Sequence, residues 1–207
     1  SGSISINGNT LTVDQNTQRG VINWNTFNVG AGNTVQFNQP NAQSKTLNIV
    51  SGGVPSNIQG SLLANGQIFI QNSSGILFGK GAVVNVGSLL ATTKAIDPNA
   101  FMNGDVLTLS STGKSGLVQN DGNIQASGFV TLVGDQVRNT GSITVPGGQV
   151  VLAAGDSATV ALANGQGLSL TLTNATANAL VENSGQIVAD NGSVLLTARG
   201  SDTLLKT

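Results

Sequence analysis

Short apolar runs alternate with polar corners along most of this chain. In the stretch 65–82, the apolar runs 68–70 and 76–78 flank the polar corner 71–75. Both runs are short, rich in β-branched and aromatic residues, and bounded by Gly or Asn, which is typical of short strands. The glycines in this stretch exclude a long helix. The pattern therefore predicts a repeating unit of strand, sharp corner and strand.

A repeated motif, V-x-N-x-G-x-I, begins at Val118, Val137 and Val181. The first two copies are 137 − 118 = 19 residues apart, which fits one coil of a β-solenoid. The third copy lies 181 − 137 = 44 residues after the second, enough for one coil and an insertion. In a solenoid, the Asn residues of successive copies are expected to stack into a ladder of side-chain amides.

The N-terminal segment predicts a hairpin followed by a cap. Residues 3–13 alternate polar and apolar positions on both sides of the turn 7–9, which is the pattern of a β-hairpin. Ile22, Trp24 and Phe27 follow, and Trp24 is the only tryptophan in the chain. Because a large ring can close the end of an apolar core, we expect these three residues to form the core of an N-terminal cap.

Two longer segments interrupt the repeat. Segment 156–179 alternates polar and apolar residues around 164–167, which predicts a hairpin inserted at one corner and lying on the solenoid wall. Segment 92–115 is a second excursion, with an expected helical turn within 95–102 and a strand at 106–109. The sequence thus predicts an all-β solenoid with excursions outside the coils.

We expect one domain over residues 1–207. Its parts are a cap with the first strands (1–50), coils (54–91), an excursion (92–115), coils (117–155), an inserted hairpin (156–179) and a last coil (180–207). Since solenoids need polar terminal caps, the apolar strand near the end predicts that the last coil continues into a longer β-helix.

Composition narrows the function classes. Only 8% of the residues are charged, against about 25% in an ordinary domain, and the net charge is −1. This balance argues against nucleic acid or an anionic membrane surface as a partner. The chain has neither Cys nor His, which excludes disulfides and thiol catalysis and removes the commonest metal ligands. The absence of Cys fits both chance and export of an unfolded chain.

No catalytic set is evident, and no metal site or cofactor is expected. The carboxylates are scattered, and we expect them at solvated corners: Asp14, Asp97, Asp105, Asp121, Asp135, Asp156, Glu182, Asp190 and Asp202. The eight basic residues are equally dispersed. β-Helix enzymes that cut polysaccharides need clustered acids or a Ca²⁺ site, so we predict that the domain is not an enzyme.

Four strings of residues carry a resemblance to a known family. GVINWNTFNVG (20–30) and VQFNQPNAQS (35–44) lead into TLNIVSGGVPSNI (46–58), and GSLLANGQIFIQNSSGILFGKGA (60–82) continues the series. These strings resemble, in the same order, the two-partner secretion domain, also called the haemagglutination activity domain, of filamentous haemagglutinins and high-molecular-weight adhesins. The resemblance is strong over residues 1–95, and the later repeats agree with it.

The resemblance implies a right-handed parallel β-helix with an N-terminal cap. It also implies a secretion signal that is read by an outer-membrane transporter with periplasmic POTRA domains. The protein would then be secreted, or held at the surface of a Gram-negative bacterium, after crossing the periplasm and losing its signal peptide. The candidate residues for this stretch, either as contacts that the transporter recognises or as structural corners, are Asn65, Gly66, Asn72, Ser73, Ser74 and Gly75.

One departure bears on that stretch. The family often has Asn-Pro-Asn-Gly where this chain has Asn72-Ser73-Ser74-Gly75. Without Pro the backbone φ is less fixed, so we favour a structural corner over a contact read by the transporter. The alternative functions are an adhesive module that binds host cells, glycans or matrix through one of the excursions, and a polysaccharide-acting enzyme.

Overall fold

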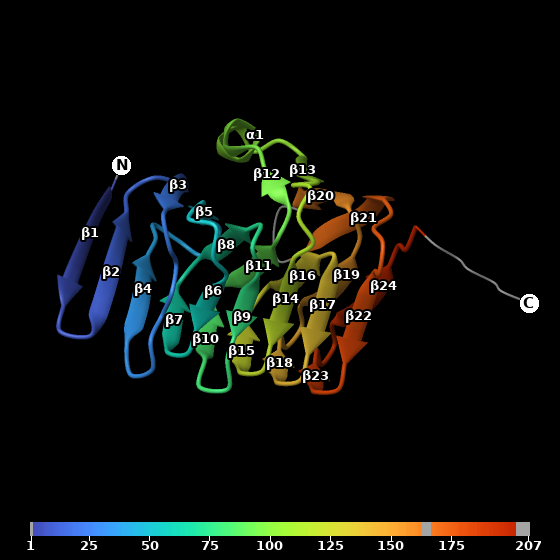
Figure 1. Ribbon diagram of the computed structural model, residues 1–207. Helices are drawn as coiled ribbons and strands as arrows, with labels where there is room; N and C mark the ends of the chain where they lie inside the picture. The colour runs from blue at the N-terminus through green and yellow to red at the C-terminus, as the bar shows by residue number, and fades with distance from the viewer. Residues whose placement is uncertain (1, 163–166, 202–207) are drawn as a thin grey trace, which may run out of the picture.

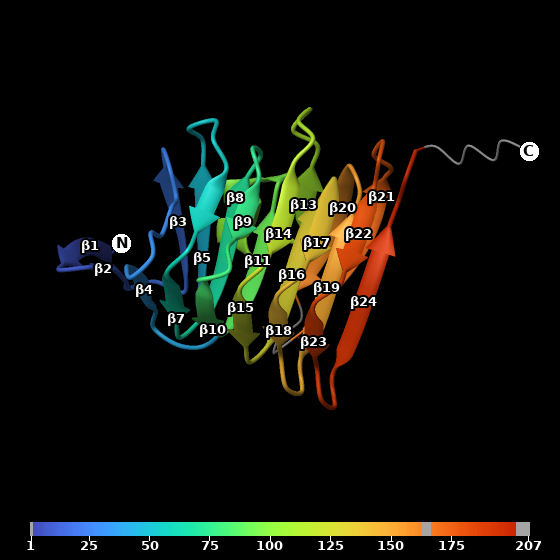
Figure 2. The same ribbon diagram turned by 60° about the horizontal axis from the view of Figure 1, so that its bottom comes forward.

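The computed structural model describes residues 2–162 and 167–201 (Figure 1). Three sheets wind around a common interior, and the strands of successive coils stack from the blue N-terminal end to the red C-terminal end (Figures 1 and 2). A smaller sheet and a short helix lie outside this stack. The short strands follow from the short apolar runs, each of which ends at a polar or glycine corner.

The first sheet, sheet A, contains one strand from each coil and an N-terminal edge strand. Its strands, in order, are β1 (Gly2–Asn7), β2 (Thr10–Gln15), β4 (Thr34–Asn38), β7 (Ser61–Ala64), β10 (Val83–Val86), β15 (Asn123–Ala126), β18 (Ser142–Thr144) and β23 (Gln186–Val188). β1 and β2 form an antiparallel hairpin, and Gly8 adopts a φ of +56° in its turn, a conformation that glycine tolerates best. Later neighbours in sheet A are parallel, as in the pairing of β10 with β15.

Sheets B and C complete the coils. Sheet B consists of β3 (Arg19–Trp24), β5 (Lys45–Val50), β8 (Gln67–Asn72), β11 (Ser88–Thr92), β16 (Phe129–Gly134), β19 (Gln149–Ala154) and β24 (Ser193–Ala198). Sheet C consists of β6 (Ser56–Ile58), β9 (Ile76–Phe78), β14 (Leu117–Asn120), β17 (Gln136–Asn139) and β22 (Leu180–Asn183). The three copies of the repeated motif are in register, because Val118 pairs with Val137 and Val137 pairs with Val181.

The elements outside the coils form a cover over sheet B, which we call the lid. It comprises β12 (Ala95–Ile96), α1 (Pro98–Asn103), β13 (Leu107–Ser110), β20 (Ser157–Leu162) and β21 (Leu168–Asn174). Its strands are antiparallel. Asp97 caps α1 by accepting a hydrogen bond from the Asn99 N–H at 2.9 Å. Figure 1 shows the lid on one side of the strand stack.

Two apolar cores result from this arrangement. The interior core lies inside the coils, with fully buried residues such as Phe37, Ile70 and Leu132. The second core lies between sheet B and the lid, with Phe69 and Phe129 from sheet B and Phe101 from α1. The ring centroids of Phe69 and Phe101 are 5.2 Å apart in an edge-on arrangement. Sheet B is therefore covered on both faces from β5 to β19, whereas β24 is mostly exposed.

The fold class predicted from the sequence, a parallel β-helix with an N-terminal β cap and hairpin excursions, is confirmed. β20 and β21 pair within the segment expected to form the inserted hairpin. Residues 164–166 of the turn expected at 164–167, and the end of the last coil, 202–207, lie outside the described residues. Within the described ranges, none of the helical structure is long and apolar enough to cross a membrane.

Candidate functional site

The corner after β8 contains the tetrad that the resemblance singled out. The Asn72 side chain is 1% exposed, and its Nδ2 donates to the Val54 carbonyl and to the Ser56 Oγ, both at 3.0 Å. The Asn72 Oδ1 accepts from the Ser74 N–H at 3.0 Å. Gly75 has a φ of +122°, which a residue with a Cβ rarely adopts. In the folded domain, the amide of Asn72 is thus fully used inside the molecule.

Asn65 and Gly66 form a separate corner at the opposite end of β8. The Asn65 side chain makes two hydrogen bonds of 2.7 Å with the backbone of Gln39, one to the N–H and one to the carbonyl. A Cβ on Gly66 would lie 2.6 Å from the Gln39 Oε1 and 2.7 Å from the Ser44 carbonyl oxygen. The structure therefore separates the six predicted residues into two corners, and Asn65 is exposed in the first while Ser73 and Ser74 are partly exposed in the second.

The three predicted cap residues lie in and just after β3, at the N-terminal edge of sheet B. Phe27 is buried, whereas Ile22 and Trp24 are half-buried and pack against the interior core. The rings of Trp24 and Phe27 meet edge-on with centroids 5.4 Å apart. The Trp24 Nε1 donates to the Asn48 Oδ1 at 2.9 Å, which satisfies the polar edge of the ring.

A groove of about 450 Å³ opens between the N-terminal hairpin and β3. Ile4, Val13 and Ile22 line it together with Arg19 and Met102. The β1 strand above it is an uncharged sheet edge, with Ile4 52% exposed. This end of the β-helix is less completely covered than the middle, where the core residues are fully buried.

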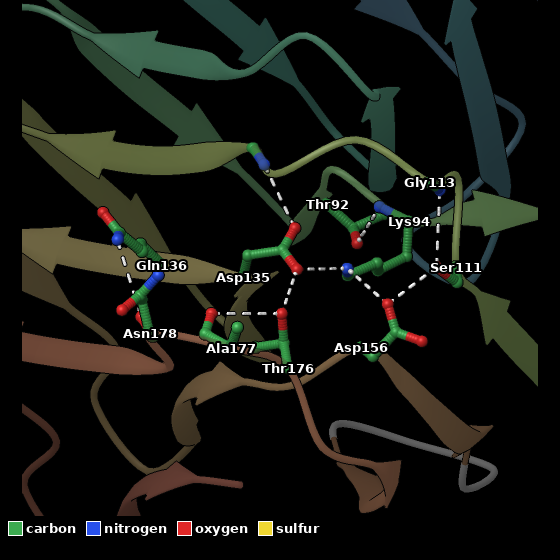
Figure 3. A network of polar contacts seen from close by, with 11 residues as sticks. Thr92, Lys94, Ser111, Gly113, Asp135, Gln136, Asp156, Thr176, Ala177 and Asn178 are labelled. Atoms are coloured by element: carbon green, nitrogen blue, oxygen red, sulfur yellow. Dashed lines mark hydrogen bonds and ion pairs between the residues drawn. The ribbon is translucent and has the colours of Figure 1, made fainter. Parts of the chain in front are cut away.

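A buried ion pair that the sequence analysis missed lies at the corner between sheets B and C (Figure 3). The Lys94 side chain is 0% exposed and that of Asp135 is 4% exposed, with 2.9 Å between Nζ and Oδ1. The expectation that all carboxylates occupy solvated corners was therefore wrong for Asp135. A second carboxylate, that of Asp156, lies 3.6 Å from the same ammonium.

Asp135 has further hydrogen-bond donors around it. The Thr176 hydroxyl donates to Oδ1 at 2.7 Å and the Gly116 N–H donates to Oδ2 at 3.1 Å. Figure 3 shows these groups converging from both excursions and from the coils. We call Lys94, Asp135, Asp156 and Thr176 the latch. Because an unpaired buried charge is costly, the latch fixes the start of one excursion and both ends of the other.

The latch predicts a stability change in acid. Burial alone would raise the pKa of Asp135, but the hydrogen bonds from Thr176, Lys94 and Gly116 and the charge of Lys94 hold this pKa below its ordinary value. A carboxyl with a lowered folded pKa contributes stability that is present above its unfolded pKa and lost as the pH falls through the folded value. The Asp135 contribution is thus constant from pH 8 to about pH 5, starts to fall near pH 4, and is lost completely only below the lowered folded pKa.

Urea unfolding measured between pH 8 and pH 3 tests this expectation. Asp135→Asn should lower the free energy of unfolding at pH 7 and flatten its fall below about pH 4. The matched control is Asp121→Asn, whose side chain is at a more exposed corner. Equal acid slopes in the wild type and in Asp135→Asn would contradict the assignment.

The expected amide ladder is present at the corner between sheets C and A. The Asn120 Nδ2 donates to the Asn139 Oδ1 at 2.8 Å, and the Asn139 Nδ2 donates to the Asn183 Oδ1 at 2.7 Å. Asn120 and Asn139 are fully buried. The ladder thus joins three successive coils, with its first two rungs shielded from water and its third, Asn183, exposed.

Replacing the middle rung should destabilise the domain. Asn139→Leu removes the shortest hydrogen bond of the buried Asn120 amide and leaves it only two longer ones to backbone carbonyls, so we expect a loss of about 1–3 kcal/mol in the free energy of unfolding. Urea unfolding monitored by tryptophan fluorescence and circular dichroism measures this loss. Gln125→Leu, at an exposed position of β15, is the control and should change stability by less than about 0.5 kcal/mol. Similar values for both variants would show that the ladder contributes nothing.

Among the described residues, no group of three or more His, Cys, Asp or Glu side chains comes together in a way that could hold a metal ion. The carboxylates of Asp135 and Asp156 share one lysine ammonium. The arrangement is therefore suited to holding segments of the chain together.

Comparison with known proteins gives consistent matches. The model of the TPS secretion domain family matches residues 1–207. Two heme/hemopexin-binding proteins of Haemophilus influenzae are similar, one 37% identical over 98% of this chain and the other 35% identical over 92%. The matches cover only 23% and 22% of those relatives, so the chain spans less than a quarter of their length.

A solved structure is also similar. The crystal structure of the HMW1 secretion domain from Haemophilus influenzae superposes with a TM-score of 0.86 at 28% sequence identity. The match covers 95% of this chain and 55% of that one. The predicted resemblance to secretion domains of adhesin-like exoproteins is thereby confirmed.

Proposed function

The chain belongs to the family of TPS secretion domains, and from this premise we propose how its structure serves export. It is a two-partner secretion domain, the part of a large secreted exoprotein that directs secretion. Its partner in our proposal is an outer-membrane transporter whose periplasmic POTRA domains bind the chain while it is unfolded. The chain reaches the periplasm first, folds outside the cell, and starts the β-helix there.

The observation that carries this proposal is the pairing of the strands in the folded domain. β8, for example, pairs with β5 on one side and with β11 on the other, so its backbone groups are free to bind a partner only before folding. The unfolded chain has a net charge of −1 and many short β-prone runs. Such a chain can add as a strand to an exposed sheet edge through backbone hydrogen bonds, without charged anchors.

Folding outside the cell would then proceed from the N-terminus. The cap residues Ile22, Trp24 and Phe27 pack against one another or against the interior core, and each later coil pairs in register with the one before it. Since each repeat of a solenoid contacts its neighbours, the first coils provide a template. Folded coils cannot slide back through a pore, which gives export its direction. We propose that residues 1–207 act as one unit in this process.

Binding of the purified chain to the periplasmic part of its transporter tests the proposal. The chain is measured in its native state and after unfolding in urea and rapid dilution. We expect binding of the unfolded chain at least about tenfold tighter than of the native one, because the paired strands are then free. Binding of neither state, or equal binding of both, would contradict recognition of an unfolded segment.

The same assay separates the two interpretations of the tetrad. Asn72→Ala removes three hydrogen bonds from a buried corner, so we expect a loss of about 1–3 kcal/mol in stability. If the tetrad is a structural corner, the unfolded Asn72→Ala chain binds the transporter as well as the wild type. Weaker binding of that unfolded variant, with Asn85→Ala unchanged, would show that the transporter reads Asn72.

We also propose that the domain is not catalytic, on the evidence of its dispersed acids and the absence of a metal-binding group among the described residues. Any contact with host cells or matrix would use the outer face of the lid, where Ser169, Thr171 and Thr173 of β21 are exposed. Deleting the hairpin would then abolish cell binding and leave secretion intact.

A further inference from the structure

The lid and the interior of the coils are separate apolar units on the two faces of sheet B. The interior core contains inward-facing residues such as Ile70, Ile124 and Leu132. The lid core contains Phe69 and Phe129 from the outer face together with Leu109 of the lid. Because the two clusters share no buried residue, removing the lid would uncover one face of sheet B and leave the interior packed.

The lid needs strands from two segments that lie far apart in the sequence. Its first strands come from segment 95–110, but β13 pairs with β20, where Leu107 lies opposite Val160. β20 in turn pairs with β21, where Leu162 lies opposite Leu168. The coil strands β14 to β19, within residues 117–154, lie between these two lid segments in the sequence.

The buried charge of Lys94 also requires that the lid close after the later segments are present. Its side chain is fully buried, and its counter-charge on Asp135 is 41 residues further along the chain. The second carboxylate, on Asp156, is 156 − 94 = 62 residues away, and Thr176, which orders Asp135, comes later still. An ammonium without these partners must remain in water, so the lid cannot close over Lys94 until they are present.

We propose that the lid is a separate, late-closing unit, which docks on sheet B only when the latch forms, after the interior of the coils has folded. Until residue 176 has left the transporter, the outer face of sheet B remains uncovered. The order in which the segments leave the transporter rests on the proposed function. Whether the lid opens separately from the coils is a property of the isolated chain. The latch thereby divides folding into a coil stage and a lid stage.

Thiol labelling of the full chain tests the separation, because the natural sequence has no cysteine. Leu109→Cys places a probe in the lid core, and Ile124→Cys places one in the interior core. Both native side chains are 0% exposed, so a thiol at either position reacts only when its unit opens. We expect the Leu109→Cys probe to react at least about tenfold faster than the Ile124→Cys probe without denaturant.

Breaking the latch should raise the labelling rate at the lid probe and not at the interior probe. Adding Lys94→Met leaves Asp135 without its cation, and we expect a further increase of at least about tenfold at Leu109→Cys with less than about twofold at Ile124→Cys. Arg138→Met, which breaks the exposed pair with Glu182 at 38% and 44% exposure, is the matched control and should change neither rate. Asp156→Asn, at a partly exposed carboxylate, should give a smaller increase at Leu109→Cys and serves if Lys94→Met does not fold.

Two results would overturn the inference. Equal labelling rates at both probes, with the same dependence on urea, would show that lid and coils open together. Equal acceleration of both probes by Lys94→Met would show that the latch holds the whole domain. Neither measurement involves the transporter. Labelling results that contradict the inference therefore do not affect the proposed function, and a lack of transporter binding does not affect the inference about the lid.

Discussion

Gly141→Ala should lower the free energy of unfolding by about 3 kcal/mol or more, because the added Cβ meets backbone on a stacked coil. That Cβ would lie 2.2 Å from the Gly122 carbonyl oxygen and 2.6 Å from the Asp121 carbonyl carbon. Backbone atoms held in two parallel ladders cannot move aside cheaply. Urea unfolding at pH 7 measures the loss.

Gly200→Ala is the matched control for Gly141→Ala. A Cβ on Gly200 would have only the Cβ of Ala179 within 4 Å, at 3.9 Å, so the same chemical change meets no backbone. We expect it to change stability by less than about 0.5 kcal/mol. A loss at Gly141 as small as that at Gly200 would mean that the corner tolerates a side chain and that stacking of coils is looser than the distances indicate.

Ile76→Asp should abolish secretion of the domain, reducing the amount in the medium at least about tenfold, because a buried unpaired carboxylate costs several kcal/mol. Ile76 is 2% exposed and belongs to the interior core. It pairs with Ser56 in the coil before and with Val118 in the coil after it. If folding outside the cell drives export, a chain that cannot stack these coils remains in the periplasm.

Immunoblots of medium and periplasm from cells that make the transporter measure this effect. Val83→Asp introduces the same charge at a 48% exposed position on neighbouring β10 and should leave secretion unchanged. Normal secretion of Ile76→Asp, with its folding shown to be lost, would mean that folding and export are not coupled.

The amide ladder and the outlines of both excursions could be predicted because they depend on local patterns. The spacing of Asn120, Asn139 and Asn183 in the repeated motif puts them in register. Such a repeat specifies its own stacking, since equal coil lengths bring equal positions together. The alternation of polar and apolar residues in segment 156–179 likewise indicated a hairpin, whatever surface the hairpin packs against.

The latch could not be predicted in the same way. Lys94 and Asp135 are 41 residues apart, and whether they meet depends on where the excursion leaves the coil and where the chain returns. One signal was available: Asp135 and Asp156 each follow a Gly at or just after the end of a sheet B strand, and they are 156 − 135 = 21 residues apart. That spacing is close to one coil, so stacked carboxylates at one corner should prompt a search for a buried cation.

The cap and corner residues illustrate a third case. The sequence indicated Trp24 and Asn72 as residues of interest, and the structure gives each a hydrogen-bonded position. In our proposal the transporter binds the unfolded chain, in which the contacts that Trp24 and Asn72 make in the folded domain do not exist. Only a measurement on the unfolded or exported chain can assign them a role in recognition.

Export of residues 1–207, with and without the outer-membrane partner, tests the central claim most directly. The chain is produced with a signal peptide in cells that make or lack the transporter, and its amount in the medium and in the periplasm is measured. As a secretion domain, it should appear in the medium only when the transporter is present and remain in the periplasm otherwise. Retention in the periplasm despite a functional transporter, or release that does not depend on one, would contradict the account.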